Sequence, residues 1–225
     1  MRKHLPVLFF LVACILNLYG KFAGIDALAA AVKPALMPLL ALSTMVYALD
    51  HRMDRRALEI LVGAQLFGCA GDIFLLSNEF VMFASGIGAF LIGHIFYMSL
   101  FGGKSWKGLS WFGWILSLAI MGGAVYGLVI LLKVEGALLI PMAVYGMALM
   151  LLIFSTFCGV IRFREKGTWI ILLIGSLLFT FSDSLIAAST FKVVSGPYVP
   201  VIIMLTYLSA QSLLAIGAFK LARKD

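Results

Sequence analysis

The stretch TWIILLIGSLLFTFSDSLIAAS, residues 168–189, decides the fold of this chain, and Asp183 is its only charged residue. A helix needs about 20 predominantly apolar residues to cross the hydrocarbon core of a bilayer, so the stretch predicts a transmembrane helix. A charged side chain at the centre of a bilayer costs roughly 2.5 kcal/mol or more on insertion scales. We therefore expect Asp183 to have a function.

Similar stretches occur along the whole chain. Of its 225 residues, 63% are hydrophobic and only 12% are charged, about half the charged fraction of a typical soluble domain. The pattern predicts an all-α polytopic membrane protein, a single domain over residues 1–225 joined by short connections. Its transmembrane helices are expected at 5–20, 30–49, 57–77, 80–101, 109–132, 137–160, 168–189 and 198–219.

The basic residues predict the orientation of these helices. Of the 17 Lys and Arg residues, the predicted outer side holds four, namely Lys21, Lys33, Lys133 and Lys192, and the other thirteen lie on the inner side. The positive-inside rule then places both termini in the cytoplasm. The net charge of +7 is spread between apolar runs, where it sets topology and meets anionic lipids, so no nucleic-acid partner is expected. A compact membrane domain of this kind favours a bacterial inner membrane.

Two local patterns need an interpretation. The N-terminus resembles a secretory signal, because the basic segment Met1 to His4 precedes an apolar run and Ala27-Leu28-Ala29 resembles a cleavage site. We nevertheless expect this segment to be retained as the first helix. The three cysteines lack paired spacing, so the sequence predicts neither a disulfide framework nor a zinc site.

A second intramembrane acid, Asp72, matches Asp183. LFGCAGD at 66–72 resembles LFTFSD at 178–183, and the two aspartates lie 111 residues apart in the third helix of each half. Parallel repeats over residues 1–103 and 104–225 would place both acids at one depth. At 1.5 Å per residue, that depth is about 8–9 Å from the outer helix ends.

Other intramembrane polar residues are expected near these acids. His94 and Tyr97 share one face of the helix at 80–101, and Tyr207 and Gln211 lie one helical turn apart. Their depths predict a cavity open to the outer leaflet, floored by His94, Tyr207 and Gln211. The alternative is that such residues only supply hydrogen bonds between helices. Lys33, at an outer helix end, could likewise only extend to the interface.

These residues resemble the YhhN-like integral membrane proteins, which include the lysoplasmalogenases. The resemblance extends over residues 30–215. It rests on Lys33-Pro34 with Pro38, Gly71-Asp72, Gly86-x3-Phe90-x3-His94-x2-Tyr97, Pro141-x3-Tyr145, Phe179-x2-Ser182-Asp183 and Tyr207-x2-Ala210-Gln211. It implies an eight-helix membrane hydrolase that cleaves the vinyl ether bond of a lysoplasmalogen to a fatty aldehyde and a glycerophospho-alcohol.

The implied chemistry suits two buried carboxyl groups. A vinyl ether is cleaved by protonation of its β-carbon, so the enzyme needs an acid that still holds its proton near neutral pH, which low-dielectric surroundings favour. A second carboxylate would stabilise the cation or activate water, as in glycosidases. We predict Asp72 and Asp183 as this catalytic pair, and the sequence does not decide which of them donates the proton.

The remaining site residues have predicted supporting roles. Lys33 could hold the lipid phosphate as a point charge, and apolar walls could accept the alkenyl chain. Others could position water or orient the carboxyls: His94, Tyr97, Tyr145, Ser182, Tyr207 and Gln211. No cofactor or metal is required by this scheme, although a metal-dependent hydrolase is an alternative.

Two other classes of function fit the same sequence. A proton-coupled transporter also places Asp and His inside the membrane, but the predicted cytoplasmic half is almost wholly apolar, which favours a pocket that ends within the membrane. A lipid-binding protein without turnover would keep the cavity and tolerate the loss of either acid. The head group of the lipid and the oligomeric state are left open.

Overall fold

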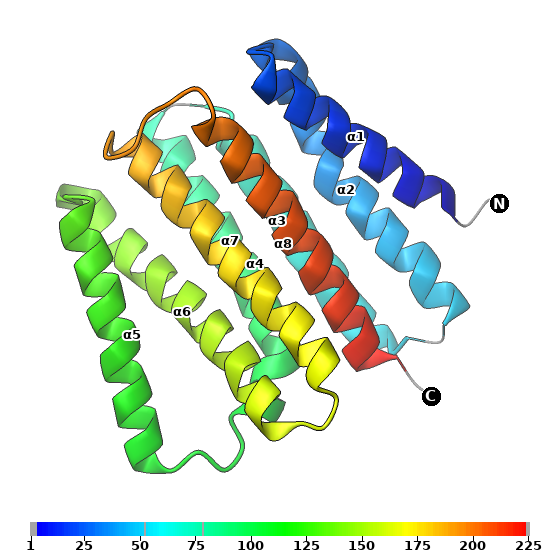
Figure 1. The fold of residues 1–225 in the computed structure, drawn as a ribbon, viewed down its shortest axis with the longest axis vertical. Coiled ribbons are helices and arrows are strands. Elements are labelled where there is room, and N and C mark those ends of the chain that lie inside the picture. The colour runs from blue at the N-terminus through cyan, green and yellow to red at the C-terminus, as the bar shows by residue number, and fades with distance from the viewer. Residues whose placement is uncertain (1–3, 52, 78, 224–225) are drawn as a thin grey trace.

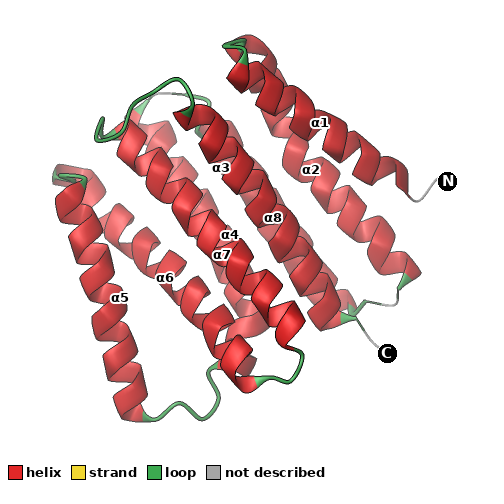
Figure 2. Cartoon of the chain, in the orientation of Figure 1, coloured by secondary structure: helices red, strands yellow, loops and turns green. Residues whose placement is uncertain are grey.

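The computed structural model describes residues 4–51, 53–77 and 79–223, which form eight long helices and no strand (Figure 2). Arg2, Lys3, Arg52 and Lys224, which entered the prediction of topology, lie outside these ranges. A short 3-10 turn at Gly136–Leu138 precedes the sixth helix. The helices are α1 Leu5–Phe22, α2 Asp26–Asp50, α3 Arg55–Phe74, α4 Phe80–Ser105, α5 Trp111–Leu131, α6 Leu139–Arg162, α7 Lys166–Thr190 and α8 Val199–Ala222.

The predicted all-helical membrane fold is confirmed. Eight helices among the described residues are long and apolar enough to cross a bilayer, and each overlaps one predicted span. Local chemistry explains several helix starts. The side chains of Asp54 and Ser110 accept hydrogen bonds from backbone N–H groups in the first turns of α3 and α5, as N-cap residues do. The multi-pass membrane protein predicted from hydrophobic length is therefore the observed architecture.

Two helix ends differ from prediction. The pair Gly102-Gly103 was expected to follow the fourth helix, but α4 continues to Ser105, whose hydroxyl donates to the carbonyls of Phe101 and Gly102. Conversely, α3 ends at Phe74, because Leu75–Ser77 form a turn in which the Leu76 N–H bonds back to Ile73. The chain is already turning at residues that a purely apolar pattern assigns to the helix.

The helices form an elongated antiparallel bundle (Figure 1). The pair α1–α2 lies along one side and α5–α6 along the other, with α3, α4, α7 and α8 between them. Helix α4 also packs against α6, and α8 contacts α1, α2 and α3. Helix α5 packs chiefly against α6 and buries only Met121 and Val125 among its side chains. Its many exposed apolar side chains suit contact with lipid.

The connections predicted to be cytoplasmic lie together at the same ends of the helices. His4 is hydrogen-bonded to the hydroxyl of Tyr47 at the end of α2 (3.1 Å). An isolated bridge joins Met53, just before α3, to Arg223 after α8. This sidedness agrees with the predicted alternation, while the cytoplasmic orientation and the two parallel repeats stay predictions.

Candidate active site

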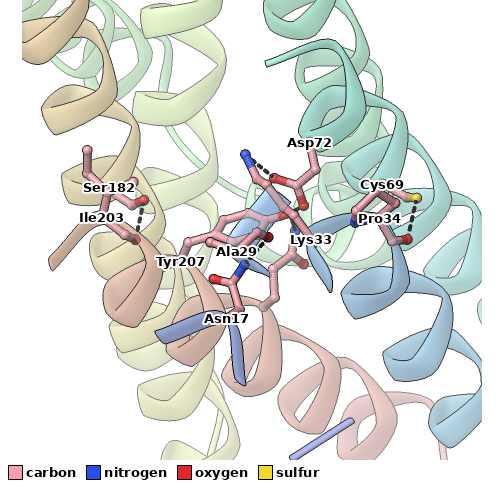
Figure 3. A network of polar contacts seen from close by, with 10 residues as sticks. Asn17, Ala29, Lys33, Pro34, Cys69, Asp72, Ser182, Ile203 and Tyr207 are labelled. Atoms are coloured by element: carbon pink, nitrogen blue, oxygen red, sulfur yellow. Dashed lines mark hydrogen bonds and ion pairs between the residues drawn. The ribbon is translucent and has the colours of Figure 1, made fainter. Parts of the chain in front are cut away.

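Asp72 is buried between three helices with a partner on each carboxylate oxygen (Figure 3). It lies on α3 and is 2% exposed. The Nζ of Lys33 on α2 lies 3.3 Å from Oδ1, and the hydroxyl of Tyr207 on α8 donates to Oδ2 at 2.8 Å. A buried charge is tolerated when it is paired and hydrogen-bonded. This arrangement provides both conditions for an ionised Asp72.

Lys33 has a protein partner that sequence reasoning did not foresee. Sequence reasoning assigned its charge to a lipid phosphate, but its side chain is only 13% exposed and forms an ion pair with Asp72. Next to it on α2, the carbonyl of Pro34 accepts a hydrogen bond from the Sγ of Cys69 on α3 (3.4 Å). The lysine therefore belongs to the α2–α3 interface that holds Asp72.

Asp183 is buried on α7 with a different set of partners. It is 7% exposed, and the hydroxyl of Tyr145 on α6 donates to its Oδ2. Within the described ranges, its Oδ1 has no hydrogen-bond partner and the carboxyl forms no ion pair. Electrostatic interactions still reach it from Asp72 and Lys33. The two acids therefore share one region but differ in their surroundings.

A cluster of aromatic rings connects the two acids. The ring of Phe179 lies 5.6 Å from that of Tyr207 and 4.6 Å from that of His94, measured between centroids. The His94 ring in turn lies 5.5 Å from that of Tyr145. Phe90 contacts both Phe179 and Tyr207. Because Tyr207 binds Asp72 and Tyr145 binds Asp183, the helices bring both carboxyls to one site.

Other predicted site residues form hydrogen bonds deeper in the bundle. Tyr97 donates to Oε1 of Gln211 at 2.8 Å, and Nε2 of Gln211 lies 3.4 Å from the hydroxyl of Tyr207. This chain ends at Asp72. His94 Nδ1 lies 2.6 Å from the carbonyl oxygen of Phe90, so Nδ1 carries the proton, while Nε2 has no partner in the described part of the chain. The polar residues hold the tyrosines and rings in place around the acids.

Ser182, another predicted site residue, is hydrogen-bonded to the backbone and not to a carboxyl group. Its hydroxyl donates to the backbone carbonyl of Ile203 at 3.1 Å, which ties α7 to α8 (Figure 3). The family motif placed it beside Asp183 in sequence, but adjacent residues on a helix point in different directions. Ser182 therefore positions α7 and does not touch the acid.

Glycines allow the helices to approach closely at Asp72. A Cβ on Gly71 would lie 2.7 Å from the ring of Phe90, and one on Gly68 would lie 3.1 Å from Nε2 of Gln211. These small residues bring α3 against α4 and α8 at the level of the site. Phe179, which the prediction left without a role, could have been found from its position four residues before Asp183, on the same helix face.

An apolar pocket opens beside Asp183. Its lining includes Phe83 and Ile87 of α4, Leu128 of α5, and Met142 and Leu149 of α6. Asp183, Tyr145 and Phe90 also line it, whereas His94, Tyr207 and Gln211 do not. The pocket thus differs from the predicted cavity, which had the last three residues as its floor.

The two acids lie at different distances from the ends of their helices. Both were expected five or six residues from the outer end of a helix. Asp72 lies two residues before the last residue of α3, and Asp183 lies seven before the last residue of α7. The early end of α3 explains the difference. Within the described residues, no group of three or more His, Cys, Asp and Glu is placed to hold a metal ion.

Comparisons with known proteins show the family of the chain. The model of the YhhN family matches residues 28–218. The chain is similar to lysoplasmalogenase TMEM86B of Mus musculus (29% identity) and of Homo sapiens (30% identity), each over 72% of the chain and 64% of the relative. The enzyme of the same name from Sus scrofa is 29% identical over 80% of the chain and 72% of the relative. The chain thus spans less than two thirds of the mouse and human relatives. No solved structure matches it significantly.

Proposed function

This chain belongs to the YhhN family, and on that premise we propose that it is a membrane hydrolase that cleaves the vinyl ether bond of lysoplasmalogens. The products would be a fatty aldehyde and a glycerophospho-alcohol. The relatives in three mammals carry the name lysoplasmalogenase. A bacterial inner membrane, with cytoplasmic termini, is the location we propose.

One observation carries the proposal: two buried carboxyls, each bonded to a tyrosine, lie around one aromatic cluster beside an apolar pocket. The pocket offers an apolar surface for a hydrocarbon chain. The buried acids offer a proton donor and a carboxylate within one site, which acid-catalysed addition of water to an enol ether requires. Catalytic groups are often found at such buried, interacting acids.

The reaction can be written with these groups. One carboxylic acid transfers its proton to the β-carbon of R–CH=CH–O–R′, which leaves an oxocarbenium ion and a carboxylate. Water adds to the α-carbon and loses a proton to a carboxylate, which gives a hemiacetal. The C–O bond to R′ then breaks as the hydroxyl proton passes to the leaving oxygen, which gives R–CH2–CHO and R′–OH. The aspartate ends as it began.

The test compares two lipids with the purified protein. A lysoplasmalogen and the ester lysophospholipid with the same head group would be supplied separately, and aldehyde release measured. We expect aldehyde from the vinyl ether only, with losses of at least 100-fold in Asp72→Asn and Asp183→Asn, the range typical of acid–base groups. The control is Asp26→Asn, because Asp26 is 83% exposed in its pair with Lys21.

The outcomes separate the classes of function. Full activity in both buried-acid variants contradicts the proposed mechanism. Absence of aldehyde from the wild-type protein contradicts the hydrolase itself and favours transport or lipid binding.

A further inference from the structure

We propose that Asp183, and not Asp72, donates the catalytic proton, that Tyr145 positions it, and that the apolar pocket beside it takes the alkenyl chain. This inference rests on the proposed function, whose acid pair it resolves into two roles. Three features of the structure support it: the charges, the hydrogen bonds and the pocket.

The charges in the site allow only one ionised aspartate to be compensated. Asp72 and Asp183 are the acids among the buried residues of the described chain, and Lys33 is the one cation paired with either of them. An uncompensated charge in low-dielectric surroundings is costly. The site is electrically neutral when one carboxyl is protonated. Because Lys33 lies 3.3 Å from Asp72, the proton belongs on Asp183.

The hydrogen bonds give the same assignment. Both oxygens of Asp72 already face a donor, Lys33 Nζ on Oδ1 and the Tyr207 hydroxyl on Oδ2, so a proton on either would compete with a donor already there. Asp183 accepts from Tyr145 at Oδ2 and has an unpartnered Oδ1. A neutral carboxylic acid fits this pattern, because its carbonyl oxygen accepts and its hydroxyl oxygen is left to donate. Tyr145 thereby selects Oδ1 as the oxygen that holds the proton.

The pocket brings the substrate to the same acid. Asp183 and Tyr145 line it, and neither Asp72 nor its partners Lys33 and Tyr207 do so. The walls nearest to them are hydrocarbon, with Ile87, Met142 and Leu149 among them. A lysolipid whose alkenyl chain fills this pocket presents its vinyl ether carbons, which adjoin the chain, to Asp183.

The proton transfer keeps the site neutral. The O–H bond at Oδ1 of Asp183 breaks, and the π electrons of the vinyl ether form a C–H bond at the β-carbon. The substrate becomes an oxocarbenium ion beside the new Asp183 carboxylate, so opposite charges form together and no charge is left uncompensated. Water attacks the α-carbon and returns a proton to Asp183. Asp72 and Lys33 stay ionised throughout, so their contribution to the electrostatic field in the site does not change during the reaction.

Infrared difference spectroscopy tests the proton position without reference to any substrate. Protein labelled with 13C at the aspartate carboxyl would be measured in detergent at neutral pH. We expect an isotope-shifted carbonyl band of a protonated carboxyl in the wild type and in the double variant Lys33→Met with Asp72→Asn, in which the site is neutral only when Asp183 holds its proton. The band should be lost in Asp183→Asn. Asp26→Asn, at an exposed acid, is the matched control.

A second variant covers the case in which Asp183→Asn does not fold. In Asp183→Glu the protonated band should persist but no longer shift with aspartate labelling, because the proton sits on glutamate. The proposal is overturned if the band is absent from the wild type, or if the double variant Lys33→Met with Asp72→Asn removes it and Asp183→Asn does not. These results hold whether or not aldehyde is released, so failure of the inference and failure of the proposed function are separate outcomes.

Activity then tests the donor role. We expect kcat to fall at least 100-fold in Asp183→Asn. In Asp183→Glu, which restores a proton donor, kcat should be at least tenfold higher than in Asp183→Asn. Activity within a few-fold of wild type in Asp183→Asn, with the vinyl ether still cleaved, would show that another group donates the proton.

Discussion

Phe90 on α4 packs directly on Gly71 of α3, so closely that a Cβ at position 71 would lie 2.7 Å from the ring. The same ring contacts Phe179 and Tyr207, which lie between the two acids. Gly71 immediately precedes Asp72 in the chain. The position of Asp72 within the site therefore depends on the absence of a side chain at its neighbour.

Gly71→Ala should displace the Phe90 ring and weaken the bundle. Overpacking of a well-packed interior typically costs about 1–3 kcal/mol, so we expect a lower unfolding temperature in detergent and slower aldehyde release. Gly88→Ala on the facing helix is the control, because a Cβ at position 88 would have no neighbouring atom within 4 Å. Equal unfolding temperatures in the two variants would argue against the packing constraint.

Lys33→Met alone should destabilise the protein more than Lys33→Met combined with Asp72→Asn. Removing one partner of a buried ion pair leaves the other charge uncompensated, at a cost of about 3–5 kcal/mol. The double variant Lys33→Met with Asp72→Asn should recover part of that loss in a double-mutant cycle of unfolding free energies. Arg55→Met, at an ion pair with Glu59 in which both side chains are exposed, should have little effect. Strictly additive changes at the two sites would contradict a coupling between Lys33 and Asp72.

Tyr145→Phe should lower kcat with little change in KM. The variant keeps the ring and removes only the hydroxyl that donates to Asp183, and the loss of one hydrogen bond, about 1.4 kcal/mol, corresponds to roughly a tenfold slower reaction. Tyr126→Phe, at a 69% exposed position on α5, is the matched control. A change in KM alone would assign Tyr145 to substrate binding instead of to positioning of the acid.

Ser184→Phe should discriminate between substrates by chain length. Ser184 lines the apolar pocket one residue after Asp183, so an aromatic ring there takes space that a long alkenyl chain needs. We expect KM to rise at least tenfold for a long-chain lysoplasmalogen and less for a short-chain analogue. Ser189→Phe, at an exposed position on the same helix, is the control. Equal changes for both chain lengths would place the chain elsewhere.

Sequence reasoning located the acids well and their partners poorly. The number of helices followed from apolar length. Each acid lies in the third helix of its half, and this predicted that the two could share a site at one depth. The partners were different. Lys33 was assigned to a lipid phosphate or to the interface, and its pairing with Asp72 was not foreseen. Ser182 was assigned to positioning water or a carboxyl, and its bond to the Ile203 carbonyl was not foreseen. These contacts depend on how each helix is rotated, and a pattern of polar residues within one helix does not contain that information.

The sequence by itself determined that this chain forms eight helices long and apolar enough to cross a membrane, because hydrophobic length is a local property. It also singled out Asp72 and Asp183, because a charge is costly in hydrocarbon wherever the helix packs. Only the tertiary structure decided that Lys33 and Tyr207 surround one acid while Tyr145 and an apolar pocket meet the other. The reason is that these partners come from different helices, whose approach is set by contacts such as Gly71 with Phe90.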